Sequence, residues 1–297
     1  MFLPLSPTRH FKPSSPEVPS PADVVLGAAH WIEYLGLIGV IGVFTVRRLG
    51  ANSPRIVWAR PPMLLALRAA FIGGFAVVVV EALVAGGSLS GAVAYLFGGP
   101  AGWVRIARVA AEGGAVALCM LGRPLVAPVA LAAAASLAFA GHAAAVNPAG
   151  GAIFADALHV LSAGVWAGGI MALATLRPPG GWNGEDGRAL VGRFGRVALI
   201  AFAITAMTGV LNATSELREL SDLWSTSYGL VLTAKSVGVL IMVALSAFAW
   251  RRGFGVVSFE AGIAILVLAA TAALAAYPLP PARLPGDGPT LEAVTQR

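Results

Sequence analysis

The chain consists largely of apolar segments long enough to cross a lipid bilayer as helices. A spanning helix needs about 20 apolar residues, at a rise of about 1.5 Å per residue. Eight segments reach this length, at residues 24–46, 64–86, 103–121, 125–143, 152–176, 194–213, 229–250 and 256–277. Only 11% of the residues are charged, whereas a soluble domain carries about a quarter. The sequence therefore predicts an all-α, polytopic membrane helix bundle with eight transmembrane helices.

The distribution of arginine predicts how these helices are oriented. Loops on one side of the eight-helix arrangement contain arginine at positions 47, 48, 55, 60, 123, 177, 188, 193, 196, 251 and 252. Outside the two tails, the loops of the other side contain only Arg218. Cytoplasmic loops are enriched in Lys and Arg, so we expect both termini on the outer, periplasmic side. Removing the third helix, which Arg105, Arg108 and Glu112 interrupt, would reverse this bias for every later loop.

The predicted domain organisation is one membrane domain between two tails. Residues 1–23 are rich in proline and lack the features of a signal peptide, and we expect a disordered tail there. Residues 24–277 form the transmembrane domain, and residues 278–297 form a flexible C-terminal tail. The net charge of +6 reflects inner-face arginine rather than a nucleic-acid site, because no basic patch with interleaved aromatic residues is present. A single cysteine, Cys119, excludes disulfides and thiolate metal clusters.

Three histidines lie near the outer ends of predicted helices. His30 is in the first helix, His142 ends the fourth, and His159 lies three residues after Asp156 on one face of the fifth. Ionisable residues inside membranes are rare and usually functional, and imidazole suits copper, zinc, nickel or iron. We predict that these histidines bind one metal ion, with Asp156 and Glu33 as further ligands or hydrogen-bond acceptors. The alternative is that they are unrelated helix-end residues bonded to the backbone or to lipid headgroups.

Other polar side chains inside the predicted helices are candidates for an ion pathway or for charge compensation within the bundle. The i, i+4 spacing of Arg108 and Glu112 predicts an internal ion pair. Thr205 belongs to a polar stripe on the sixth helix, and Glu260 opens the last one. The residues predicted to line a pathway or to make polar contacts in the bundle are Trp166, Glu81, Arg108, Glu112, Thr208, Asn212, Tyr228 and Lys235.

Several of these motifs resemble the copper resistance protein D (CopD) family. The resemblance covers about residues 24–281 and is most specific from residue 141 onward. It implies a bacterial inner-membrane protein linked to copper uptake or tolerance, which often works with a periplasmic copper-binding protein of the CopC type. The motifs that carry it are Gly141-His142-Ala143, Asp156-Ala157-Leu158-His159, Gly164-Val165-Trp166-Ala167-Gly168-Gly169, Thr208-Gly209, Asn212-Ala213, Tyr228-Gly229, Lys235 and Glu260.

The resulting functional prediction is a non-enzymatic protein that imports copper ions through the bilayer. The sequence contains no nucleotide-binding motif, so transport must be passive, ion-coupled or driven by the membrane potential. A cation moving inward gains about 2.3 kcal/mol per charge per 100 mV, which favours import. Methionines are sparse and dispersed, which leaves the oxidation state of the copper ion open. Two alternatives stay open: a haem b electron-transfer protein using His30 and His159, and a metal-binding accessory protein without transport.

Overall fold

The computed structural model describes residues 19–51, 54–139, 149–217, 219–252 and 257–277. All regular elements within these ranges are helical, which confirms the predicted all-α class. The long helices are α1 (Pro21–Ala51), α2 (Met63–Gly86), α4 (Pro100–Met120), α8 (Glu185–Glu216), α10 (Ser227–Arg252) and α11 (Val257–Ala276). The shorter elements are η1 (Pro54–Ile56), α3 (Leu89–Phe97), α5 (Val126–Ser136), η2 (Leu137–Phe139), α6 (Ala149–Ala163), the π-helical turn η4 (Gly164–Gly168), α7 (Gly169–Ala174) and α9 (Asp222–Ser225).

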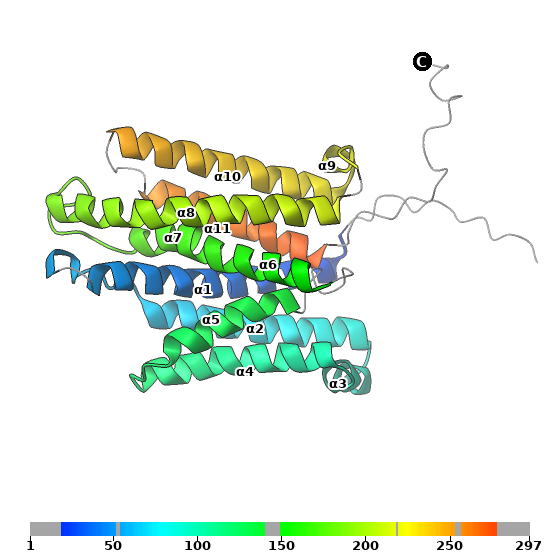
Figure 1. The fold of residues 1–297 in the computed structure, drawn as a ribbon. Helices are drawn as coiled ribbons and strands as arrows, with labels where there is room; N and C mark the ends of the chain where they lie inside the picture. The colour runs from blue at the N-terminus through cyan, green and yellow to red at the C-terminus, as the bar shows by residue number, and fades with distance from the viewer. Residues whose placement is uncertain (1–18, 52–53, 140–148, 218, 253–256, 278–297) are drawn as a thin grey trace, which may run out of the picture.

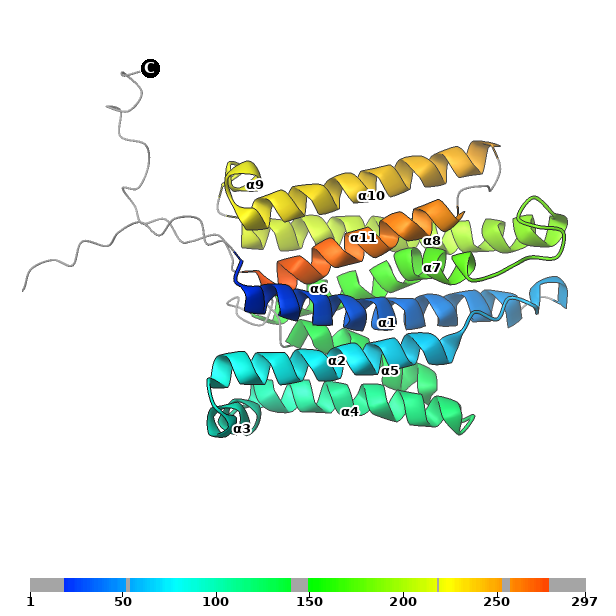
Figure 2. The ribbon, with the colours of Figure 1, turned by 180° about the vertical axis from the view of Figure 1, so that it is seen from behind.

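The helices run back and forth along one direction, with α1 in the middle of the bundle (Figure 1). α1 packs against α2, α5, α7, η4 and α11. Figure 2 shows from behind that α4 lies at one outer side of the bundle and α10 at the other. The short helices α3 and α9 lie at the same end, where α1 begins and α11 ends.

Six helices of the described residues are long and apolar enough to span a bilayer: Pro21–Ala51, Met63–Gly86, Gly150–Ala174, Glu185–Thr214, Ser227–Phe248 and Val257–Ala276. The third and fourth predicted spans fall on α4 and α5. α4 carries three charged side chains inside its apolar stretch. α5 and η2 together form a short apolar helix, Val126–Phe139, which ends at the last described residue before position 149. Six spans are therefore supported by length and composition, while eight spans and the orientation of the termini remain predictions.

The first helix begins earlier than predicted. Asp23 accepts a hydrogen bond from the Ser20 backbone N–H at 2.8 Å, and the Ser20 hydroxyl accepts one from the Asp23 N–H at 3.3 Å. These reciprocal bonds form a capping box, with Pro21 at the first helical position, where proline is favoured. Residues 21–23, which were predicted to be part of the tail, therefore belong to α1, and Ser-Pro-Ala-Asp was the sequence signal for this start.

Glycine allows the central helix to approach its neighbours at backbone distance. A side chain at Gly42 would overlap the backbone of Gly168 in η4, and one at Gly168 would overlap the carbonyl oxygen of Ile38. A side chain at Gly36 would overlap the backbone of Ala70 in α2. In a bilayer the hydrophobic effect does not drive helices together, so this close packing is a main source of association. These glycines therefore serve helix packing.

We expect Gly42→Ala to destabilise the bundle, because the added methyl group has no space against Gly168. Overpacking of this kind costs about 1–3 kcal/mol. Gly262→Ala is the matched control, since a side chain on this α11 residue meets nothing within 4 Å and alanine favours helix by about 1 kcal/mol. Denaturant unfolding of the two detergent-purified variants measures their free energies of unfolding. Equal stability of the two variants would contradict the assigned contact.

Candidate functional site

A cluster of ionisable side chains is buried where α1 meets α4. Glu33 is completely buried, and Arg108 and Glu112 are 4% and 1% exposed. Arg108 Nε lies 2.9 Å from Glu33 Oε1, and His30 Nδ1 lies 3.3 Å from Glu33 Oε2. Arg108 thus pairs with a residue of another helix, so the predicted i, i+4 pair with Glu112 is not the one that forms. In the packed bundle, the Glu33 carboxylate of α1 lies closer to the Arg108 guanidinium than the Glu112 carboxylate of α4 does.

Two glycines of α2 make room for this buried cluster. A side chain at Gly73 would overlap the backbone of Glu33, and one at Gly74 would overlap the carboxyl of Glu112. The helices therefore enclose the carboxyl groups closely and leave little space for water. Within the described residues, neither carboxyl oxygen of Glu112 has a hydrogen-bond partner. The charges that act on this carboxyl group are those of Glu33 and Arg108.

A second polar group lies between α6 and α8, around His159. The ring Nδ1 lies 3.0 Å from the backbone oxygen of Thr205 and 3.1 Å from Thr208 Oγ1. A carbonyl oxygen can only accept, and the Thr208 hydroxyl already donates to the Ile204 carbonyl at 2.7 Å. Nδ1 is therefore the donor, and in the neutral ring Nε2 carries the lone pair. Metal-binding histidines commonly have this arrangement, in which the second ring nitrogen donates to a backbone carbonyl.

Other contacts along the α6–α8 interface continue this polar seam. Asn212 Nδ2 donates to Asp156 Oδ1 at 3.1 Å, and Ser162 Oγ lies 2.8 Å from Thr205 Oγ1. Trp166 in η4 packs its ring on Phe202 of α8, with centroids 4.8 Å apart. The prediction that Asp156 and His159 share one face is confirmed, because both contact α8, and Trp166 contacts the same helix. Ser162 was not singled out from the sequence, because a serine in a helix commonly bonds only its own turn.

The predicted metal ligands are divided between these two groups. His30 and Glu33 belong to the α1–α4 cluster, whereas Asp156 and His159 belong to the α6–α8 seam. His142 lies outside the described residues. Across the part of the chain that the structure describes, no group of three or more His, Cys, Asp or Glu side chains is placed to hold a metal ion. Joint ligation by three histidines therefore remains a prediction.

The remaining predicted residues lie at several places in the bundle. Glu81 of α2 pairs with Arg105 Nε of α4 at 2.5 Å, and the Arg105 guanidinium lies 5.1 Å from the ring centre of Tyr95 in α3. Tyr228 is 3% exposed at the start of α10. Lys235, further along α10, interacts electrostatically with His159.

One buried carboxyl group lies apart from both polar groups. Glu260 of α11 is 6% exposed, and its Oε1 accepts a hydrogen bond from the Ser246 hydroxyl of α10 at 3.0 Å. Ser246 was not singled out from the sequence.

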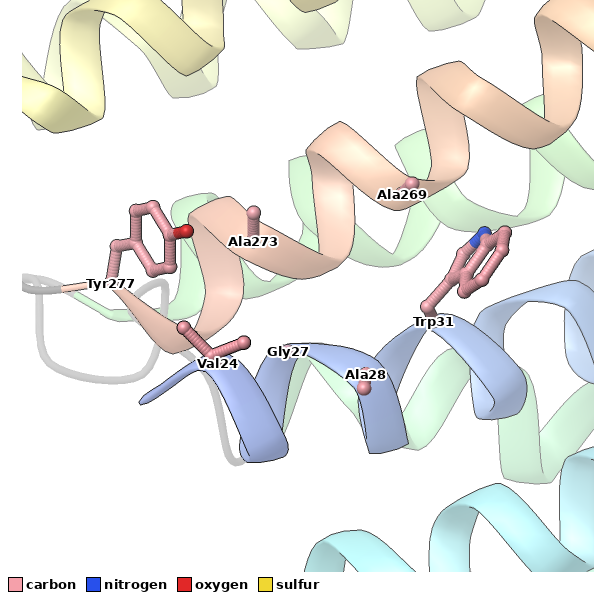
Figure 3. A pocket seen from close by; sticks show the side chains of 7 residues that line it. All are labelled: Val24, Gly27, Ala28, Trp31, Ala269, Ala273 and Tyr277. Atoms are coloured by element: carbon pink, nitrogen blue, oxygen red, sulfur yellow. The ribbon is translucent and has the colours of Figure 1, made fainter. Parts of the chain in front are cut away.

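A shallow groove of about 180 Å³ lies between the start of α1 and the end of α11. Its lining is mainly apolar, with Trp31 at one end and Tyr277 at the other (Figure 3). The Trp31 indole N–H donates to the Ile265 carbonyl at 3.1 Å. The groove contains no charged side chain, so neither polar group opens into it.

Comparison with known proteins gives two findings. The family model described as copper resistance protein D matches residues 188–274, which include most of α8, all of α10 and most of α11. The chain is 34% identical over 159 residues to "Copper transport protein CutJ" of Bacillus subtilis (strain 168). This alignment covers 50% of the chain but only 29% of that relative. No solved structure matches the chain.

We expect Arg108→Met to lower the free energy of unfolding strongly, because it leaves the Glu33 carboxylate buried without its partner. Breaking one side of a buried pair typically costs about 3–5 kcal/mol. The double variant Glu33→Gln/Arg108→Met should recover most of this loss. Arg55→Met is the control, since the Arg55–Glu185 pair is exposed and such pairs contribute about 0–1 kcal/mol. Denaturant unfolding in detergent compares the four proteins, and similar losses for Arg108→Met and Arg55→Met would contradict the pairing.

Proposed function

We propose that this chain, part of which matches the copper resistance protein D family model, belongs to that family and imports copper ions across the cytoplasmic membrane of a bacterium. An integral membrane protein related to copper transport or resistance agrees with both matches and with the six apolar helices. Import is the direction that the membrane potential favours for a cation. Because the alignment covers a minor part of the relative, the cargo and its direction are inferences about this chain.

The observation that carries the proposal is the orientation of His159. Its Nδ1–H is held by Thr205 and Thr208, which presents Nε2 as a copper ligand. Asp156, one turn earlier on α6, is oriented by Asn212 and is proposed as a second ligand. His142 is proposed as the third. His30 and Glu33 are left out of this copper site, because Glu33 already neutralises Arg108.

The proposal extends to membrane topology and to a partner. We place both termini on the periplasmic side, with eight crossings that include α4 and α5. A periplasmic protein of the CopC type would deliver copper at the end where α1 begins. α6 begins at the same end, so Asp156 and His159 lie within its first three turns from that side.

We expect His159→Ala to reduce copper uptake into proteoliposomes by at least about tenfold, since even residues that only orient a metal ligand change affinity by about 10–100-fold. Uptake is measured with Cu(I) under reductant and with Cu(II), because the oxidation state is open. His10→Ala, in the N-terminal tail, is the control and should retain uptake. Uptake by His159→Ala at the wild-type rate would contradict the site.

The same purified protein distinguishes copper import from the two alternative functions, haem b binding and metal binding without transport. A Soret band in the purified protein would favour haem b binding, and stoichiometric copper binding without any flux would favour an accessory protein. Either result would overturn the import proposal.

We expect single cysteines placed before α3 and after α4 to be labelled from opposite sides. In a Cys119→Ala background, Ser88→Cys should react with a membrane-impermeant thiol reagent from the periplasmic side. Arg123→Cys should react only after the membrane is permeabilised. Both positions are exposed, so accessibility does not depend on opening the bundle. Labelling of both from one side would show that α4 does not cross, and would reduce the number of crossings.

A further inference from the structure

The α1–α4 cluster contains more buried negative than positive charge. Glu33 and Glu112 each carry a carboxyl group at no more than 1% exposure, and Arg108 provides one guanidinium at 4% exposure. Arg108 lies 2.9 Å from Glu33, so this pair is neutral by itself. An ionised Glu112 would add one uncompensated charge in a water-poor site. Burying such a charge costs several kcal/mol, and carboxyl groups avoid the cost by taking up a proton.

The groups facing Glu112 from the surrounding helices offer it no further cation. From α1 the group that acts on Glu112 is the Glu33 carboxyl. His30 Nδ1 lies 3.3 Å from Glu33 Oε2, and Tyr34 interacts electrostatically with Glu33 and Arg108. From α2 the neighbour is Gly74; the charged residues of α2 are Glu81, paired with Arg105, and Arg68, which is exposed. α5 has no titratable side chain, and Tyr95 of α3 belongs to the Glu81–Arg105 group.

The geometry of Glu112 points in the same direction. Both of its oxygens lack a hydrogen-bond donor within the described part of the chain, whereas an ionised carboxylate normally accepts several hydrogen bonds. A metal ion would need several ligands around one point, and none of the described residues form such a group. A proton needs only one oxygen, and is therefore the cation that this site can accommodate.

We propose that Glu33 and Glu112 together bind one proton, which resides on Glu112, and that this buried site couples proton exchange to copper movement. The second part rests on the proposed transport function. When α1, α2 and α4 are packed as observed, the proton cancels the excess charge. If α4 moves away from α1 during transport, water reaches Glu112, and a solvated glutamate with a pKa of about 4.3 loses its proton at neutral pH.

Closure of the interface then requires one proton to be bound again. The balance is one proton released on opening and one taken up on closing, without any covalent or redox step. Uptake of one proton changes such an equilibrium by up to about tenfold per pH unit, with low pH favouring the closed interface.

Infrared spectroscopy of the full chain tests the proton site directly and without copper. At neutral pH the difference spectrum of wild type minus Glu112→Gln should contain the C=O stretch of a protonated carboxylic acid. Glu81→Gln is the matched control: its carboxylate pairs with Arg105, so the same subtraction should show no such band. Absence of the band from the Glu112→Gln difference would overturn the proposal.

Proteoliposomes with an entrapped pH dye test the coupling. Wild type should move protons in fixed ratio to copper, with an uptake rate that depends on pH. The Glu112→Gln variant should move no protons with copper. Any copper uptake that it retains should not depend on pH. An unchanged proton-to-copper ratio in Glu112→Gln would overturn the coupling. If wild type moves no copper but the infrared band is present, the transport function fails and the proton site stands.

Discussion

The ion pair between Glu33 and Arg108 determines how α4 can belong to this bundle. α4 contains Arg105, Arg108 and Glu112 within one apolar stretch, and a charged side chain inside a bilayer is costly unless it is paired. Arg108 is neutralised by Glu33 of α1, and Arg105 by Glu81 of α2. Both partners lie on helices that pack together. The position of α4 therefore depends on these two contacts more than on its hydropathy.

Glycine supports the same arrangement by removing side chains where the helices come closest. Gly73 and Gly74 of α2 receive the backbone of Glu33 and the carboxyl of Glu112, and Gly42 of α1 receives the backbone of Gly168. The second contact falls on η4, the π-helical turn that joins α6 to α7. Such turns are frequent at functional sites. Trp166 in this turn lies about two helical turns after His159 in the chain and contacts α8. Packing and polar chemistry are thus concentrated on the same few helices.

The two polar groups have different physical characters, which suggests different roles. Around His159 the ring Nδ1 donates to Thr205 and Thr208, so in the neutral ring Nε2 carries the lone pair. Around Glu112 no donor is present within the described residues, and charge is unbalanced unless a proton is bound. Tyr34 of α1 interacts electrostatically with Glu33, Arg108 and Asp156, and so connects the two groups. A metal site and a proton site in one bundle are the parts that ion-coupled transport requires.

The helical class, the positions of the apolar segments and the shared face of Asp156 and His159 could all be predicted from the sequence. These features depend on local periodicity, and in a bilayer the backbone must satisfy its own hydrogen bonds within each helix. The tertiary structure alone decided that Arg108 pairs with Glu33 rather than with Glu112, and that the predicted ligands fall into two groups. Spacing along the chain fixes which residues share a face, but the neighbour that this face meets depends on how the helices pack.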